Sequence, residues 1–370
     1  MSSHAVLEIQ LSSLTHNYHF IKSKLHAQTK LLAVVKANGY GSESVSVAKK
    51  LEELGIDYLA VAYVVEGVKL RAAGIKTPIL VLHPQLGDFK DIIHQCLEPS
   101  IYSLRSLEAF IKTAQDLDCE AYPIHLKTNT GLNRLGITER DFPSVFSSLK
   151  AQKAVSPKGL MSHLAASDDL LEREFTERQI KTFSNHIQLF EAELGPIPLK
   201  HLLNTSGILN FPQAQFNMAR SGIGLYGYSN NPDIDKQLKP VATLKANVSQ
   251  IHELQAGDWV GYNKGFVANK PMRIGTISLG HADGISRQYG QGKGVVSVGG
   301  GLAPIVGNVC MDMLMVELGD LQVQEGDMAV IFGEGAGQIA SAEDFASGAK
   351  TISYELLTAI SARVQRQIIE

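Results

Sequence analysis

Lys36 is a reactive side chain at the end of a short apolar run. The run Leu31–Val35 leads into this lysine, and Asn38-Gly39 follows as a turn signal. The pattern predicts a buried strand of a parallel sheet with Lys36 at its carboxyl end. Burial disfavours the ammonium form, which lowers the pKa of the amine and makes it a nucleophile able to form a Schiff base. By position alone, the simpler interpretation is that Lys36 extends past the strand into water.

The same pattern recurs along the chain: polar or ionisable residues stand where apolar runs end. These residues are Lys36, Lys127 with Arg134 just beyond it, His163, Asn204 with Thr205, and Arg220. Taken singly, each is a strand-end residue that meets water. If the fold brings the strand ends to one place, they predict a binding or catalytic site.

Eight apolar runs alternate with helical patterns between Leu31 and Arg220. The predicted strands are Leu31–Val35, Asp57–Ala62, Pro78–Leu82, Glu98–Ile101, Tyr122–Lys127, Lys158–His163, Leu199–Asn204 and Phe216–Arg220. Eight strand–helix units indicate a (β/α)8 TIM barrel, whose functional groups gather at the carboxyl ends of the strands. A doubly wound open sheet is the alternative, but no Gly-x-Gly-x-x-Gly motif opens its first helix.

The rhythm changes after residues 228–240, a polar, proline-containing stretch predicted to be a linker. Beyond it, strands follow one another without intervening helices: Val241–Ile251, Met272–Leu279, Gly294–Val298, Ala303–Val309, Met313–Leu318 and Met328–Phe332. Gly299-Gly300-Gly301 is expected to form a hairpin turn. A helix over Tyr354–Ile369 is expected to close this β-rich domain.

The predicted fold class is therefore α/β plus all-β, in two domains. Residues 1–232 are expected to form the barrel, and residues 233–370 are expected to form the β-rich C-terminal domain. The N-terminal strand His4–Gln10 can pack with the C-terminal domain.

Length and composition describe a globular protein with a large core, because 370 residues with 44% hydrophobic content suffice for two domains. A net charge of −3 gives no reason to expect nucleic acid or an anionic membrane as a partner. Cys96, Cys119 and Cys310 form no CxxC pair, which favours a reducing compartment over a disulfide framework or a zinc site. Without a bilayer-length apolar run or a secretory leader, a cytoplasmic location is expected.

Several motifs resemble those of alanine racemases, which are pyridoxal-phosphate enzymes of the barrel-plus-β-domain type (fold type III). The segment AVVKANGYG resembles the family's cofactor-lysine signature, and KTNTGLNRLG, Ser162-His163, LNTSG, RSGIGLYG, VCMDMLMVEL and TISYE follow in the family's order. The resemblance covers essentially the whole chain. It implies interconversion of L- and D-alanine to supply D-alanine for peptidoglycan, by a homodimer whose active sites are shared head to tail.

The resemblance also implies a role for each matching residue. Lys36 would bind pyridoxal 5'-phosphate covalently as a Schiff base and act as one catalytic base. Cofactor contacts are implied for Tyr40, His163, Asn204, Thr205, Gly222, Ile223 and Tyr354. Arg220 would face the pyridine nitrogen. Because an arginine releases no proton there, the ring nitrogen stays unprotonated and the cofactor is a weaker electron sink.

Substrate contacts are implied as well. Arg134 resembles the arginine that helps bind the substrate carboxylate, and Met311 and Asp312 match residues near the same group. Lys127 matches a lysine that the family often carbamylates, which turns a cation into an anion able to pair with Arg134. Asn129 departs from the family, which usually has Asp at this position of a KxDTG motif.

The main departure is His281. The family's second base is the tyrosine of a Gly-Tyr-Ala-Asp-Gly turn, whereas this chain has Gly280-His281-Ala282-Asp283-Gly284. Racemisation needs a base on each face of the planar carbanion, and Lys36 serves only one. An imidazole, with a reference pKa of about 6.5 against about 10 for a phenol, is mostly neutral at cellular pH and can accept a proton.

The alternative is that His281 only fills the space and the second base is lost, with Tyr262 and Tyr289 as other phenols in the same domain. Two further functions therefore stay open: a broad-specificity racemase of small amino acids, and a catalytically impaired homologue that still binds pyridoxal phosphate.

Overall fold

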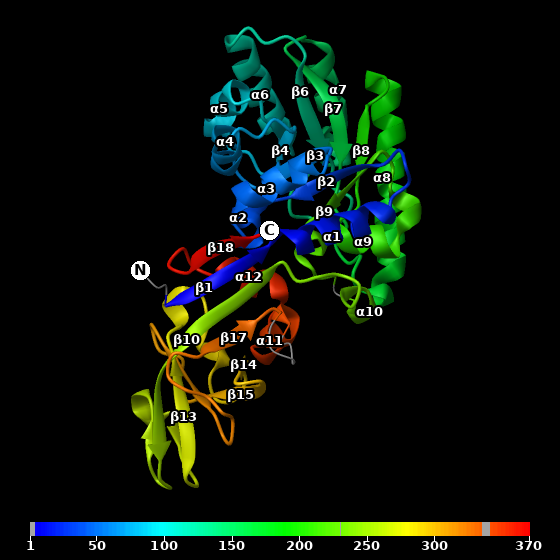
Figure 1. The fold of residues 1–370 in the computed structure, drawn as a ribbon. Coiled ribbons are helices and arrows are strands. Elements are labelled where there is room, and N and C mark those ends of the chain that lie inside the picture. Colours follow the sequence, from blue (N-terminus) through cyan, green and yellow to red (C-terminus); the bar gives the residue numbers. More distant parts are fainter. Residues whose placement is uncertain (1–3, 230, 335–340) are drawn as a thin grey trace.

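The structure, a computed structural model, describes residues 4–229, 231–334 and 341–370. Figure 1 shows a barrel wrapped by helices and, below it, an elongated β domain. The expectations for residues 1–3, and for Asn230 within the predicted linker, lie outside the described residues.

The predicted barrel is confirmed. Eight parallel strands close on themselves: β2 (Lys30–Val34), β3 (Tyr58–Val61), β4 (Ile79–Val81), β5 (Glu98–Ile101), β6 (Tyr122–Lys127), β7 (Val155–Met161), β8 (Leu199–His201) and β9 (Met218–Ser221). Strand β2 pairs in parallel with both β3 and β9, which completes the ring. Most strand residues are buried because helices cover the outside and side chains fill the inside.

Helices surround the barrel (Figure 1): α1 (Leu11–Ser23), α2 (Lys36–Tyr40), α3 (Ser44–Glu53), α4 (Val64–Ala72), α5 (Phe89–His94), α6 (Leu104–Asp116), α7 (Phe142–Lys150), α8 (Arg173–Leu194) and α9 (Thr205–Asn210). Helix α6 illustrates how they form. Its N-cap Ser103 accepts a hydrogen bond from the Ser106 N–H, and its buried face carries Leu107 and Phe110. Within the described ranges, no helix is both long and apolar enough to cross a membrane.

An antiparallel β domain follows the barrel, as predicted. Its main sheet has the order β13-β16-β15-β14-β17-β10, followed by β1 (Ala5–Gln10) and β18 (Gln365–Ile369). The strands are β10 (Ala242–Leu254), β13 (Met272–Ile277), β14 (Val295–Val298), β15 (Gly301–Val306), β16 (Leu314–Glu317) and β17 (Met328–Phe332), with a separate hairpin of β11 (Trp259–Val260) and β12 (Phe266–Val267). Gly299 and Gly300, with φ of 59° and 77°, form the turn between β14 and β15.

Both ends of the chain meet in this sheet. Strand β1 (Ala5–Gln10) pairs antiparallel with β10 and parallel with β18 (Gln365–Ile369), so blue β1 lies beside red β18 in Figure 1. Strand β1 then leads directly into α1 of the barrel. Between the barrel and β10, the polar stretch contains a short helix, α10 (Pro232–Asp235).

The helix predicted over Tyr354–Ile369 is wrong in its second half. After α11 (Ala342–Gly348), helix α12 (Ser353–Ala359) ends where Ile360 adopts an extended backbone. The last residues form β18, because the free edge of β1 offers hydrogen-bond partners that a helix would leave unpaired. Pairing in the tertiary structure overrides the local helical preference.

Candidate active site

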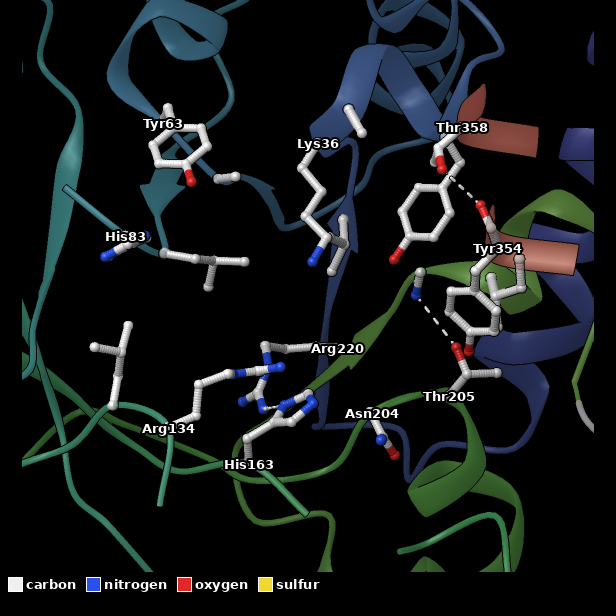
Figure 2. A pocket seen from close by; sticks show the side chains of 18 of the residues that line it. Lys36, Tyr63, His83, Arg134, His163, Asn204, Thr205, Arg220, Tyr354 and Thr358 are labelled. Carbon is white, nitrogen blue, oxygen red and sulfur yellow. Dashed lines mark hydrogen bonds between the residues drawn. The ribbon is translucent and has the colours of Figure 1, made fainter. Parts of the chain in front are cut away.

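A cavity of about 970 Å³ opens at the carboxyl ends of the barrel strands (Figure 2). The structure brings most of the predicted site residues to it: Lys36, Tyr40, Lys127, Arg134, His163, Asn204, Thr205, Arg220, Gly222, Ile223 and Tyr354. Helix α12 supplies Tyr354, so the segment after the β domain completes one wall of the barrel mouth. His281, Met311 and Asp312 are not among the described residues that line this cavity.

The short element α2, which begins with Lys36 at the mouth, has a left-handed backbone rather than that of a regular helix. After β2, the residues Ala37, Asn38, Gly39 and Tyr40 have φ of 52°, 54°, 64° and 51°. This conformation costs about 1–2 kcal/mol for each residue with a side chain, so neighbouring contacts must hold it. The Glu66 carboxylate accepts hydrogen bonds from the N–H groups of Ala37 (2.6 Å) and Ala62 (2.7 Å), which ties the turn to the end of β3.

The environment of Lys36 favours its neutral amine. Burial lowers the pKa of Lys36, and the positive charge of Arg134 lowers it further, against an opposing effect of the Glu66 carboxylate. A larger neutral fraction makes the amine a better nucleophile and a better acceptor of a proton.

The mouth carries an excess of positive charge. Among the described residues, four cationic side chains line it, those of Lys36, Lys127, Arg134 and Arg220, against a single carboxylate, that of Glu355. Burial, then Arg220 and Arg134, lower the pKa of Lys127 to about 8. Such a cavity attracts anions, and a phosphate or a carboxylate would stabilise its charges.

A second part of the cavity is suited to an anion through neutral donors. The N–H groups of Gly222 and Gly224 both point to Thr205 Oγ1, at 3.2 and 3.4 Å. A Cβ atom at residue 222 would lie 2.3 Å from Tyr40 Oη, so only glycine leaves room for this hydroxyl. Burial raises the pKa of Tyr40, which stays a hydrogen-bond donor at neutral pH. Backbone and hydroxyl donors thus converge at one wall.

Arg220 is held rigidly at the floor of the cavity. Its side chain is 3% exposed, and its nitrogens donate to His201 Nδ1 (2.9 Å), to the Ser162 carbonyl (2.7 Å) and to His163 Nδ1 (3.1 Å). Figure 2 shows the Arg220–His163 contact below Lys36. Burial lowers the pKa of Arg220 only to about 10, so it remains a cation at neutral pH. Because Arg220 occupies His163 Nδ1, that imidazole is neutral.

Two amide side chains, one of them in the cavity wall, stabilise local backbone structure. Asn204 caps helix α9 by accepting a hydrogen bond from the Gly207 N–H at 2.8 Å. The Asn129 side-chain oxygen accepts from the N–H groups of Gly131 and Asn133, both at 3.1 Å. An amide oxygen therefore closes this loop as a carboxylate oxygen would.

Sequence reasoning missed the opposite wall of the cavity. Figure 2 shows Tyr63 and His83 there, and their ring centroids are 5.6 Å apart. The His83 ring also lies 5.7 Å from that of Tyr102. Tyr63 follows the end of β3 by two residues, and His83 follows the end of β4 by two. Lys36 was identified because it is an ionisable residue at the end of an apolar run. The same pattern, extended to the residues just beyond each strand, would have identified Tyr63 and His83.

His281, Met311 and Asp312 form a separate cluster in the β domain. The His281 N–H donates to the Cys310 carbonyl at 2.9 Å, and the Ala282 N–H to the Met311 carbonyl at 3.0 Å. Arg363 joins Asp312 Oδ1 (2.8 Å) and Asp283 Oδ1 (3.3 Å). His281 and its neighbours are thus held together on the surface of the β domain.

This surface is unusually apolar. Met311 is 58% exposed, Trp259 57% and Tyr262 76%. With the adjacent Met313, they line a groove of the β domain. Exposed apolar patches of this kind mark interaction surfaces.

Comparison with known proteins places the chain in a family. Residues 9–230 match the family model of the alanine racemase N-terminal domain, and residues 241–368 that of the C-terminal domain. An alanine racemase from Thermodesulfovibrio yellowstonii is 37% identical over 100% of this chain and 99% of its own length.

Solved structures agree. The alanine racemase of Streptomyces lavendulae has a TM-score of 0.95 and 29% identity, covering 100% of this chain and 98% of its own. That of Bartonella henselae, with covalently bound pyridoxal phosphate, has a TM-score of 0.89 and 27% identity, with 100% of both chains covered.

The barrel, the β domain and these similarities define a pyridoxal-phosphate-dependent isomerase of fold type III. Within that class, the chain belongs to the alanine racemase family.

Proposed function

We propose that this protein interconverts L- and D-alanine with pyridoxal phosphate held on Lys36, and that it supplies D-alanine for peptidoglycan. The observation that carries the proposal is Lys36 itself, a half-buried amine of lowered pKa in a cavity that also holds the Thr205 hydroxyl and the Gly222 N–H. The direct test is formation of D-alanine from L-alanine, and of L-alanine from D-alanine, by the purified protein supplied with pyridoxal phosphate. Absence of both conversions would contradict the proposal.

The residues of the mouth fit this cofactor. Lys36 Nζ would hold its aldehyde carbon, and the phosphate would lie against Thr205, Tyr40, Tyr354 and the backbone N–H groups that follow Arg220. Arg220, fixed by His201 and His163, would face the pyridine nitrogen, while His163 and Asn204 line the space around the ring. When bound, the cofactor withdraws electrons from the Cα–H bond of the amino acid, which makes that proton removable.

Two side chains would move the proton. Lys36 Nζ takes it from, or returns it to, one face of the substrate Cα, aided by its lowered pKa. The partner subunit's His281 would act on the other face, because within one chain His281 lies apart from the cavity. The donors of Arg134 would bind the substrate carboxylate. Met311 and Asp312 of the partner subunit would lie near the same group.

The proposed homodimer follows from the separation of the two clusters. Exposed Trp259, Tyr262 and Met311 beside His281 would be buried against the barrel mouth of a second copy. Each site would then combine Lys36 of one subunit with His281 of the other.

Mixed dimers test this sharing. Lys36→Ala and His281→Phe proteins should each be inactive in racemisation. After unfolding and refolding as an equal mixture, about half of the dimers are mixed, and each mixed dimer has one intact site of two. Activity should return to about one quarter of that of the unmixed wild type. The matched control is refolding of each variant alone, which should restore nothing. A mixture as inactive as its components would contradict shared sites.

Lys127 is proposed to be carbamylated. The neutral amine of Lys127 attacks the carbon of CO2, forms an N–C bond and releases a proton, leaving an anionic carbamate. Burial, and then the charges of Arg220 and Arg134, lower the pKa of the amine to about 8, and the same two arginines would stabilise the anion. The carbamate also offsets the charge excess of the mouth and would align Arg134 for the substrate carboxylate.

Carbamate formation should rise with pH. Because the pKa of Lys127 is about 8, the reactive neutral amine increases between about pH 7 and pH 9. Protein equilibrated with ¹³C-bicarbonate should give a carbamate ¹³C signal that grows over this range. Lys127→Arg should lack the signal, whereas Lys150→Arg, on the outer helix α7, should retain it. A signal of constant size, or one kept in Lys127→Arg, would contradict the assignment.

A further inference from the structure

A chain of buried polar side chains crosses the barrel core beneath Arg220. Arg220 is 2.9 Å from His201 Nδ1, His201 Nε2 is 3.0 Å from His125 Nδ1, and His125 Nε2 is 2.9 Å from Glu98 Oε2. Both imidazoles are 0% exposed and Glu98 is 6% exposed. Glu98 is the first residue of β5, so the chain runs from the mouth towards the opposite end of the barrel.

The core is shaped around this chain. Barrel interiors are usually filled by Val, Ile and Leu, and a buried polar group is costly unless it is fully hydrogen-bonded. Here every link has a partner at hydrogen-bond distance. In β7, a Cβ atom at residue 159 would lie 2.1 Å from His125 Nδ1, so Gly159 leaves the space that the ring occupies. Because a cation stands at one end and a carboxylate at the other, all the hydrogen bonds of the chain donate in the same direction, from Arg220 towards Glu98.

The two ends determine where each imidazole carries its proton. Arg220 can only donate, so His201 Nδ1 must be a bare acceptor and its proton must be on Nε2. His201 Nε2–H then donates to His125 Nδ1, which places the His125 proton on Nε2, facing the Glu98 carboxylate. Burial and the charge of Arg220 lower the pKa of His201, in agreement with a neutral ring.

Glu98 is held as an acceptor at the far end. Burial alone would raise its pKa, but the hydrogen bonds from His125 and Lys158, together with the charge of Lys158, hold that pKa below the usual value. Lys158 Nζ donates to Glu98 Oε1 at 2.7 Å, and the Tyr58 hydroxyl lies 3.4 Å from Oε2. The carboxylate therefore receives the His125 N–H on one oxygen and the Lys158 ammonium on the other.

We propose that Glu98, His125 and His201 form a positioning relay for Arg220: the carboxylate orients both imidazole tautomers so that a bare nitrogen always faces the guanidinium. If the tautomers reversed, His201 Nδ1–H would meet an Arg220 N–H, and two donors would repel each other. Arg220 would then shift within the floor of the cavity. The effect of this shift on catalysis rests on the proposed function, in which Arg220 faces the cofactor nitrogen. The tautomers themselves can be measured independently of it.

Glu98→Gln tests the relay because it changes the direction of one hydrogen bond. The Lys158 ammonium should attract the amide oxygen, which leaves the amide NH2 facing His125 Nε2. His125 and His201 must then both carry their protons on Nδ1. Adding Lys158→Met to Glu98→Gln removes that attraction, lets the amide oxygen face His125 and should restore the original tautomers. Lys158→Met alone keeps the carboxylate and is the matched control.

The readouts are ¹⁵N chemical shifts of histidine-labelled holoenzyme, assigned from His125→Phe and His201→Phe, and steady-state kinetics. We expect protons on Nε2 of both rings in the wild type and on Nδ1 in Glu98→Gln. We expect kcat of Glu98→Gln to fall about tenfold with KM little changed, since misplacing a catalytic group by about 1 Å can cost about a hundredfold. The double variant and Lys158→Met should keep the wild-type tautomers and a kcat within about twofold.

Several results would overturn the relay. A wild-type spectrum with the His201 proton on Nδ1 does so before any variant is made. Glu98 would have only a packing role if Glu98→Gln lost activity without reversing the tautomers. The same conclusion would follow if the double variant regained neither the wild-type ¹⁵N shifts nor the wild-type kcat. Failure of the wild type to racemise alanine would instead overturn the proposed function and leave the tautomer result intact.

Discussion

Replacing Lys36 by alanine is expected to lower kcat for alanine racemisation by about 10⁴-fold and to remove the covalent attachment of pyridoxal phosphate. The reason is that one amine has two tasks, holding the cofactor and moving the α-proton on one face. The other lysine among the described residues that line the cavity is Lys127, which is the last residue of a different strand, β6. Loss of the cofactor's protein-bound absorption and racemisation assays in both directions measure the effect.

Lys30 provides the matched control because it lies at the other end of the same strand. Its side chain is outside the cavity and pairs with Asp57 at 3.4 Å. Lys30→Ala should bind the cofactor and racemise alanine as the wild type does. Borohydride reduction of the wild-type holoenzyme should place the label on the peptide that contains Lys36. A label on another lysine, or no label, would remove the basis of the proposed function.

Replacing His281 by phenylalanine is expected to abolish racemisation while one half of the proton chemistry survives. Phenylalanine keeps the apolar bulk of the ring but cannot accept a proton. Solvent deuterium should still exchange into the enantiomer whose α-proton faces Lys36. Exchange into the other enantiomer should fall by about 10²–10⁴-fold, the usual contribution of a positioned acid or base. Exchange of each enantiomer in D2O, followed by NMR, makes the measurement.

His94→Phe is the control for this experiment, since His94 is exposed at the end of α5, on the outside of the barrel. It should leave exchange into both enantiomers unchanged. Normal exchange into both enantiomers in His281→Phe would mean that another group is the second base. Loss of exchange from both would mean that His281 supports the fold of the site rather than one proton transfer.

The barrel could be predicted because each of its strands is a local pattern. Runs such as Leu31–Val35 are apolar throughout, since both faces of a parallel strand are buried, and the observed β2 begins and ends within one residue of the prediction. The C-terminal helix was overextended for the opposite reason. Residues 365–369 have no strong strand pattern, and only the open edge of β1, over 350 positions earlier, makes them a strand.

The sequence by itself determined which chemical groups the chain could use. They are a lysine at the end of an apolar strand, hydroxyls and glycines that can bind an anion, and an arginine that does not transfer its protons. These features are local, because the strand period and the turn residues place each of them at a strand end. Only the tertiary structure decided which groups meet. Closure of the barrel linked Glu98, His125 and His201 to Arg220, and left His281 apart from Lys36. Such contacts depend on strand register and ring closure, which no local pattern records.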